Sequence, residues 1–215
     1  MAFPCGFRSG AVRPAYCVLR PPGRRGVWPG PGFPRAAGWA LVANDARRPV
    51  DVIVVAVDNY QAGVLEAVDL VHEGVSTRVA LFEDPASLTD REFAKRGVPY
   101  YDAAALSVEQ LHALGIHSVE VIPRSVAGTQ DEAALLPHWC SEKGYRSLML
   151  VTSADHSRRV RRTLQRAMRG SGIDAAVLAS RYSGFDPDGS WYSRAGIRTE
   201  VVESEKLLLD LVTHP

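Results

Sequence analysis

The chain has 215 residues, of which 46% are apolar and 23% are charged, values close to those of soluble globular domains. The net charge of +1 hides an asymmetry, because residues 1–44 contain six arginines and no acid, whereas the remainder has 19 basic and 24 acidic residues. A mildly acidic domain is a poor general binder of nucleic acid, since neutralisation of phosphates dominates that affinity. The sequence therefore predicts one domain with an appendage and no nucleic-acid partner.

Membrane and metal signals are absent from the sequence. No run of about 18 apolar residues predicts a transmembrane helix, and the start lacks the apolar core of a signal peptide. The three cysteines (Cys5, Cys17 and Cys140) have no zinc-binding spacing, so neither a metal site nor a disulfide framework is expected. We expect a cytoplasmic protein, with membrane association as the alternative.

Residues 1–38 contain seven prolines and seven glycines. Such a composition neither continues a helix nor pairs as a central strand, so we predict a disordered Pro/Gly/Arg-rich extension. Its arginines could contact anionic lipid or nucleic acid, but a solvated tail fits the composition better.

Strands and helices alternate after this extension. In chain order the pattern predicts strand 52–57, helix 61–71, strand 78–82, helices 88–96 and 108–114, strand 118–123, helix 129–143, strand 148–152, helix 155–168, strand 175–179 and helix 203–212. The first of these strands is a continuous apolar run rich in β-branched residues, which is typical of a strand buried on both faces. We therefore predict that residues from about Asn44, within a domain spanning 40–215, form a doubly wound, mostly parallel, Rossmann-like three-layer α/β fold.

Ligands in such folds bind just beyond the carboxyl ends of the strands. Asp58 follows the first strand, where it is either a ligand contact or a turn and helix cap. Thr129 and Glu132 fit a capping box, and the helix that they begin would offer an anion site through its free amides. Both residues are candidates for ligand binding, with simple capping as the alternative.

The turn after strand 148–152 is the strongest candidate. Ser153 lies at the turn, and His156 and Arg159 share one face of the next helix, a set that suits a phosphate or pyrophosphate. We expect His156 to stay neutral beside the positive helix end and to act as an acid or base. In the charged and aromatic segment 191–206, Arg194 is a second candidate charge clamp, and the segment is either a ligand-facing flap or a lid held by ion pairs.

Four segments of the chain together resemble the YdcF-like family, which includes SanA- and ElyC-type envelope proteins. The matching elements are Pro49-Val50-Asp51, Thr129-x-x-Glu132-Ala133, Leu150-Val151-Thr152-Ser153-x-x-His156-x-x-Arg159, and Trp191-Tyr192-x-Arg194 with Glu200, Glu203 and Lys206. The resemblance implies a Rossmann-like sheet and a link to bacterial envelope physiology, but no settled reaction. Two features depart from the family: Asp58-Asn59-Tyr60 replaces a Gly-rich turn, and the Pro/Gly/Arg tail replaces a membrane helix.

Three hypotheses follow. The first is an enzyme acting on a phosphorylated or nucleotide-like substrate, with His156 as acid or base. The second is a non-catalytic module that senses a small anionic ligand, such as a nucleotide, an S-adenosylmethionine-like molecule or a lipid diphosphate, and acts through a protein partner. The third is a degenerate relative without a ligand. The sequence leaves open whether the protein is an enzyme and identifies no certain cofactor.

Overall fold

The computed structural model describes residues 32–124 and 128–214, which belong to a compact unit spanning Pro31–Pro215. The predicted extension over residues 1–31 lies outside the described residues. The prediction of disorder is wrong for residues 32–38, because residues from Gly32 onward form helix α1 (Gly32–Leu41). Pro34 is compatible with this helix because the amides of a first turn have no intrahelical acceptor.

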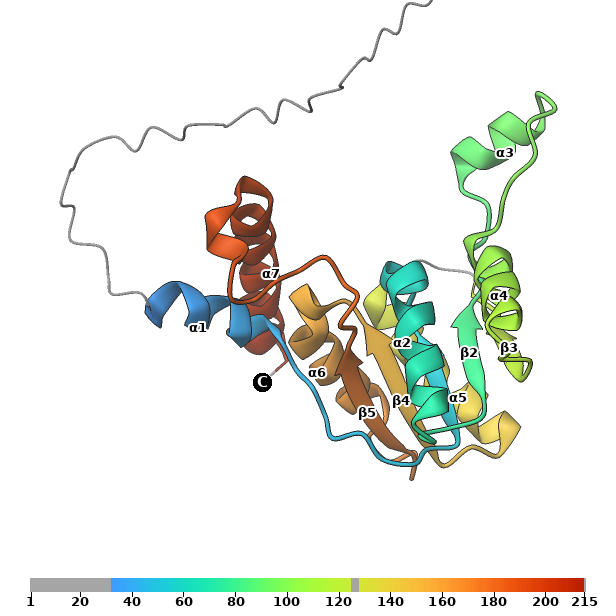
Figure 1. Cartoon of the computed structure of the whole chain (residues 1–215), viewed down its shortest axis with the longest axis horizontal. Helices are drawn as coiled ribbons and strands as arrows, with labels where there is room; N and C mark the ends of the chain where they lie inside the picture. The colour runs from blue at the N-terminus through green and yellow to red at the C-terminus, as the bar shows by residue number, and fades with distance from the viewer. Residues whose placement is uncertain (1–31, 125–127, 215) are drawn as a thin grey trace, which may run out of the picture. The chain divides into compact units, whose positions relative to one another are not determined.

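The centre of the unit is a five-stranded sheet in which every strand pairing is parallel (Figure 1). The strands are β1 (Val52–Val55), β2 (Val79–Phe82), β3 (Val119–Ile122), β4 (Ser147–Thr152) and β5 (Asp174–Ala179). Their order, β3-β2-β1-β4-β5, reverses direction between β1 and β4. The doubly wound α/β fold predicted from the sequence is confirmed, with a fully parallel sheet.

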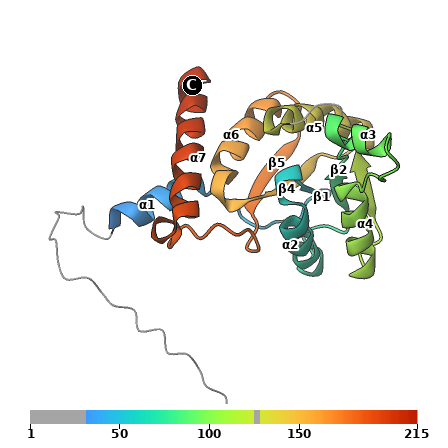
Figure 2. The same ribbon diagram turned by 90° about the horizontal axis from the view of Figure 1, so that it is seen from above.

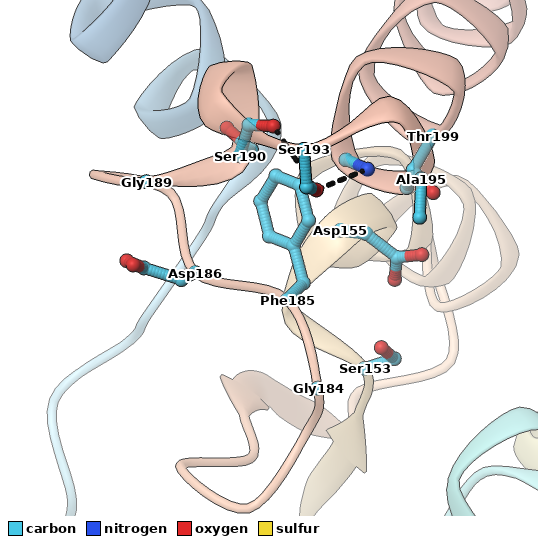
Figure 3. Close-up of a pocket in the computed structure, with 11 residues that line it drawn as sticks. Ser153, Asp155, Gly184, Phe185, Asp186, Gly189, Ser190, Ser193, Ala195 and Thr199 are labelled. Atoms are coloured by element: carbon cyan, nitrogen blue, oxygen red, sulfur yellow. Dashed lines mark hydrogen bonds between the residues drawn. The ribbon is translucent and has the colours of Figure 1, made fainter. Parts of the chain in front are cut away.

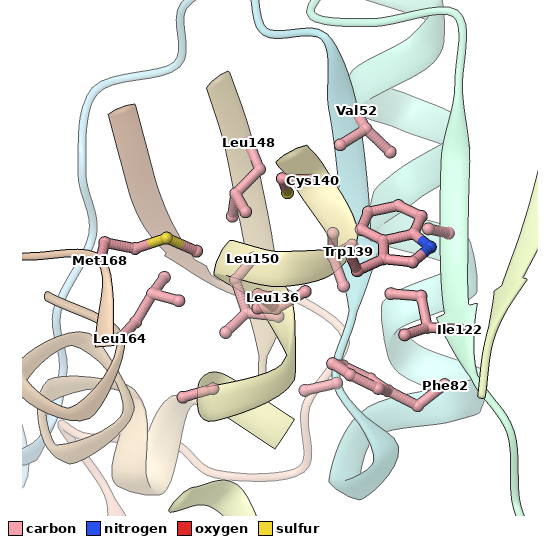
Figure 4. Close-up of a cluster of buried hydrophobic side chains, with 14 of the residues drawn as sticks. Val52, Phe82, Ile122, Leu136, Trp139, Cys140, Leu148, Leu150, Leu164 and Met168 are labelled. Carbon is pink, nitrogen blue, oxygen red and sulfur yellow. The ribbon is translucent and has the colours of Figure 1, made fainter. Parts of the chain in front are cut away.

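Helices cover both faces of the sheet because successive strand residues point to opposite sides. α5 (Thr129–Lys143) and α6 (Ser157–Ala167) cover one face, and α2 (Tyr60–His72) and α4 (Ala103–Ala113) cover the other. Figure 4 shows the hydrophobic core between the sheet and helices α5 and α6. In this core Leu136, Trp139 and Leu164 of the two helices lie with Leu148 and Leu150 of β4. The short helix α3 (Leu88–Ala94) has no buried residue.

Several predicted bounds move in the structure. Strand β1 ends at Val55 because residues Val57–Asn59 turn into a 3-10 helix. Helix α4 begins at Ala103, since the Asp102 side chain accepts a hydrogen bond from the amide of Ala104 and caps it. The last helix, α7 (Arg194–Thr213), begins nine residues before the predicted start, after a cap by Ser193.

Helix α1 and the residues after it attach to the carboxyl-terminal half of the unit. α1 contacts α6 and α7, and Gly38 is buried against the Pro187 carbonyl. Beyond α1, side chains of Asn44 and Asp45 accept hydrogen bonds from the amides of Ala179 and Val177, which covers the free edge of β5. Within the part of the chain described above, no helix combines the length and hydrophobicity needed to cross a bilayer.

Candidate functional site

The candidate site lies where the strand order reverses, at the carboxyl ends of β1 and β4. These strands are neighbours in register, with Val55 opposite Val151, so the residues that follow each strand meet at one edge of the sheet. Asp58 comes from the β1 end, and Ser153 and His156 come from the β4 end. The sheet thus brings Asp58 next to Ser153, a predicted site residue 95 positions later in the sequence, and next to His156.

The Asp58 carboxylate connects the two strand ends. Its Oδ2 accepts hydrogen bonds from the amide of Ser153 at 3.1 Å and from Thr152 Oγ1 at 3.3 Å. The same oxygen lies 3.2 Å from His156 Nε2. Burial raises the pKa of Asp58, but the His156 hydrogen bond and charge outweigh this effect and lower it overall. Asp58 therefore stays ionised and holds the turn after β4 in place.

The His156 ring lies between two carboxylates. Its Nδ1 is 2.8 Å from Asp155 Oδ1, on the opposite side from Asp58, and only 10% of the side chain is exposed. Burial lowers the pKa of His156, but hydrogen bonds and charges from Asp155 and Asp58 exceed that effect and raise it to about 9. The expectation of a neutral histidine is wrong, because two carboxylates outweigh one helix end.

This geometry changes which groups face a ligand. Both ring nitrogens of His156 are occupied by carboxylates, so the imidazolium has no free N–H directed at solvent. The side chains of Asp58 and Asp155 are 31% and 24% exposed, respectively. The role of His156 as a catalytic acid or base stays a prediction, while its observed contacts are those of a group that positions two carboxylates.

A pocket of about 340 Å³ opens beside this cluster, between the β4 end and the start of α7 (Figure 3). Four hydroxyl groups and two carboxylates line it, together with the ring of Phe185. The polar lining residues are Ser153, Asp155, Asp186, Ser190, Ser193 and Thr199. Among the described residues, no lysine or arginine lines this pocket.

The first turn of α7 forms one wall of the pocket. Ala195 and Gly196 line it, and Ser193 Oγ accepts a hydrogen bond from the Gly196 amide at 2.9 Å. Ser190 packs against this turn at Gly196, and its Oγ donates a hydrogen bond to the buried carboxylate of Glu200, also in α7. First-turn amides and the positive end of a 20-residue helix therefore adjoin an otherwise acidic lining.

Glu132 lies deeper, at the start of α5. It is 8% exposed, and its Oε1 is 3.4 Å from a guanidinium nitrogen of Arg124, which also contacts Asp84. Burial raises the pKa of Glu132 to about 7; the Arg124 charge opposes this rise and the charge of Asp58 adds to it. Glu132 is thus a buried carboxyl with a pKa near neutrality, close enough to Asp58 and His156 to be influenced by their charges.

The predicted capping box at this helix is wrong. The N-cap residue is Gly128, with φ of 147°, and no side chain caps the helix. Thr129 is already the first helical residue, and the Glu132 side chain bonds Arg124 instead of the backbone at the N-cap. A glycine fits this N-cap because its φ is in the region that side chains disfavour. The ligand-binding role of Thr129 stays a prediction.

The two predicted charge clamps differ in their surroundings. Arg159 donates hydrogen bonds from Nε and a guanidinium nitrogen to Glu203, the shorter at 3.1 Å, and Lys206 contacts the same carboxylate at 2.6 Å. Arg159 therefore joins α6 to α7, and its role toward a ligand is untested. Arg194 is exposed at the first position of α7, and its side chain makes no hydrogen bond or ion pair inside the described part of the chain.

Sequence reasoning missed the residues that complete the pocket. Asp155 stands next to His156, so a carboxylate–imidazole pair was readable from the sequence itself. Phe185 and Asp186 follow β5, and applying the strand-end rule to the fifth strand would have found them. Among the described residues, no group of three His, Cys, Asp or Glu side chains is arranged to hold a metal ion.

Comparisons with known proteins leave function to be argued from this geometry. No model of a known protein family matches the chain, and no curated protein matches it. A crystal structure of a protein from the universal stress protein family from Burkholderia pseudomallei is similar at a TM-score of 0.37 and 16% sequence identity. That match covers 60% of this chain and 96% of the other.

Proposed function

We propose that this domain binds a nucleoside-containing small molecule in the pocket between the β4 end and the start of α7. The observation that carries the proposal is the joint placement of an aromatic ring, Phe185, and two carboxylates, Asp155 and Asp186, around one pocket. A base can stack on the ring, and ribose hydroxyls can donate to the carboxylates. The volume of about 340 Å³ is in the range of small-molecule sites.

The charge of the lining bears on the rest of the ligand. Two carboxylates and no lining lysine or arginine among the described residues favour a neutral or cationic group, as in an S-adenosylmethionine-like molecule. A phosphorylated nucleoside is the second candidate, because the first turn of α7 offers amides and a positive helix end, with Arg194 exposed beside them. We assign binding and no reaction.

We also propose that the chain is a YdcF-like protein, with the link to envelope physiology that this implies. Two elements quoted for the resemblance, Ser153-x-x-His156-x-x-Arg159 and the carboxyl-terminal Glu203 with Lys206, are far apart in sequence. The ion pairs between Arg159, Glu203 and Lys206 connect them, which supports treating them as parts of one structural arrangement.

Calorimetric titration of the full chain with adenosine, ADP and S-adenosylmethionine tests the ligand proposal. Asp186→Asn is the informative variant, because Asp186 is exposed and the change removes one lining charge. We expect this variant to weaken S-adenosylmethionine binding by roughly three- to tenfold, on the order of 1 kcal/mol for a charge pair near the surface, and to leave adenosine nearly unchanged. If ADP is the ligand, the same variant should tighten binding.

Asp174→Asn serves as the matched control, since Asp174 is an exposed aspartate at the start of β5 that pairs only with Arg48 among the described residues. This control should bind every ligand as the unchanged chain does. The proposal is wrong if none of the three compounds binds, or if binding is insensitive to Asp186→Asn, Asp155→Asn and Phe185→Ala alike.

A further inference from the structure

A buried carboxyl group without a counterion lies between α1, the short 3-10 helix Ser190–Tyr192 and α7. Glu200 is only 2% exposed, and its Oε1 accepts the hydrogen bond from Ser190. Its Oε2 has no hydrogen-bond partner, and no lysine, arginine or histidine in the described part of the chain pairs with it. A carboxylate removed from water in this way must either bind a proton or receive a cation from outside the chain.

Helix α1 is the main cause of this burial. Gly38 of α1 lies over the carboxyl group, and a Cβ at this position would be 3.0 Å from Glu200 Oε1. Figure 2 shows α1 beside α7, away from the sheet. Burial raises the pKa of Glu200, and the hydrogen bond from Ser190 opposes this rise. The surroundings are therefore poorly solvated, and a cation that approaches them is attracted more strongly than it would be in water.

A groove of about 380 Å³ passes beside Glu200, a volume in the range of small-molecule sites. Its lining combines an aliphatic surface, one indole ring and two carboxyl groups, and none of the described lining residues is basic. The apolar part comes from Ala37, Trp191, Val201 and Leu208, and the acidic part from Glu200 and Glu205. Glu205 is exposed and also has no ion pair with any described residue. The groove thus favours a ligand that is both positively charged and apolar.

The hydrogen-bonding groups of the wall indicate which kind of cation fits. Glu200 Oε2 and Trp191 Nε1 are both buried, and neither has a partner, so both atoms are shielded from a ligand in the groove. A primary ammonium group would lose hydrogen bonds to water that this wall does not replace. A quaternary ammonium group makes no such bonds: its methyl groups suit an aliphatic lining, and its charge is attracted to an indole ring.

We propose that this groove binds a quaternary ammonium group of a small organic molecule, with Trp191 in contact with the methyl groups. Glu200 and Glu205 supply the opposing charge, which acts over distance and needs no direct hydrogen bond. The groove shares no lining residue with the pocket around Phe185. The inference is therefore independent of the proposed nucleoside ligand.

Calorimetric titration of the full chain with three compounds tests the proposal. The probes are choline, ethanolamine, which lacks the methyl groups, and dimethylbutanol, the uncharged analogue of choline in which carbon replaces the nitrogen. We expect choline to bind about tenfold or more tightly than either, as for a cation held by an aromatic ring and a poorly solvated carboxylate. A protonated Glu200 in an otherwise apolar groove would instead bind choline and dimethylbutanol equally, which would overturn the proposal.

Two variants locate the site. Glu200→Gln keeps the size of the side chain and removes its charge, so the preference for choline over dimethylbutanol should fall about tenfold. Trp191→Leu keeps an apolar wall without the ring and should weaken choline binding about three- to tenfold. This second variant also tests the site if circular dichroism shows that Glu200→Gln does not fold.

Glu142→Gln is the matched control, because Glu142 is an exposed glutamate of α5 that contacts only His138 among the described residues. This control should bind choline as the unchanged chain does. The proposal is wrong if choline does not bind, or if its binding is unchanged in both Glu200→Gln and Trp191→Leu. Choline binding that is lost in Asp186→Asn and kept in Glu200→Gln would place the cation in the pocket around Phe185 and would also overturn it.

Discussion

The charge state of His156 gives a prediction that can be followed quantitatively. The pKa of this residue rises from an ordinary value of 6.5 to about 9 through its contacts with Asp155 and Asp58. At about 1.4 kcal/mol per pKa unit, this rise corresponds to about 3 kcal/mol of folding stability. Because a raised pKa stabilises the protonated folded state, the contribution is complete below pH 6.5 and is lost as the pH increases through 9.

The two aspartates act at the other end of the pH scale. The pKa of each is lowered, against the effect of burial, chiefly by the His156 hydrogen bond, so their contribution is present above the ordinary value of 3.8 and is lost as the pH falls through the lowered pKa. These are the same contacts seen from the carboxylate side, so their energies are not added to that of the histidine. The cluster should stabilise the fold most between about pH 4 and 6.5.

Urea denaturation of the unchanged chain and of His156→Gln, at pH 6 and pH 9.5, measures this contribution. The difference between the two proteins should shrink by about 3 kcal/mol from the lower to the higher pH. An NMR titration of the imidazole should give an apparent pKa near 9, and Asp155→Asn should lower it. A histidine that titrates at or below 6.5 in the folded protein would refute the two-carboxylate account.

Three other substitutions test separate parts of the structure by chemical denaturation. Arg124→Ala should cost about 3–5 kcal/mol at pH 8, where Glu132 is ionised and loses its buried partner; the loss should lessen as the pH falls below about 7. A loss that does not depend on pH would contradict this assignment. Gly38→Ala should destabilise the protein by about 1–3 kcal/mol, because a Cβ would clash with the Pro187 carbonyl; an unchanged stability would show that α1 does not pack there. Leu164→Ala should cost about 2–5 kcal/mol as a fully buried side chain, and a loss below 1 kcal/mol would contradict the close packing of α6 on the sheet.

Local sequence determined most of the secondary structure. The buried strands β1, β2 and β4 were recognisable from their apolar runs, because strands covered on both faces are made almost entirely of apolar residues. The ends of helices were harder to predict from the sequence where a single capping side chain or a contact with a distant segment determines them. Asp102 extends α4 toward its start through one cap, and α1 forms from Pro/Gly-rich sequence because contacts with α6 and α7 stabilise it.

The candidate site was only partly readable. Its position at the strand ends follows from the fold class, and Asp58, Ser153 and His156 were found by that rule. Their mutual contacts were not, because the adjacency of β1 and β4 arises from the order of strands in the sheet.

The sequence by itself determined a parallel α/β domain and the edge of the sheet where polar groups gather, since hydrophobic periodicity is a local property. Tertiary structure alone decided the charge on His156, the partner of Arg159 and the exposure of Leu208 and Val212 on α7. Each of these depends on electrostatic or packing contacts between segments far apart in the chain, whose distances local sequence does not encode.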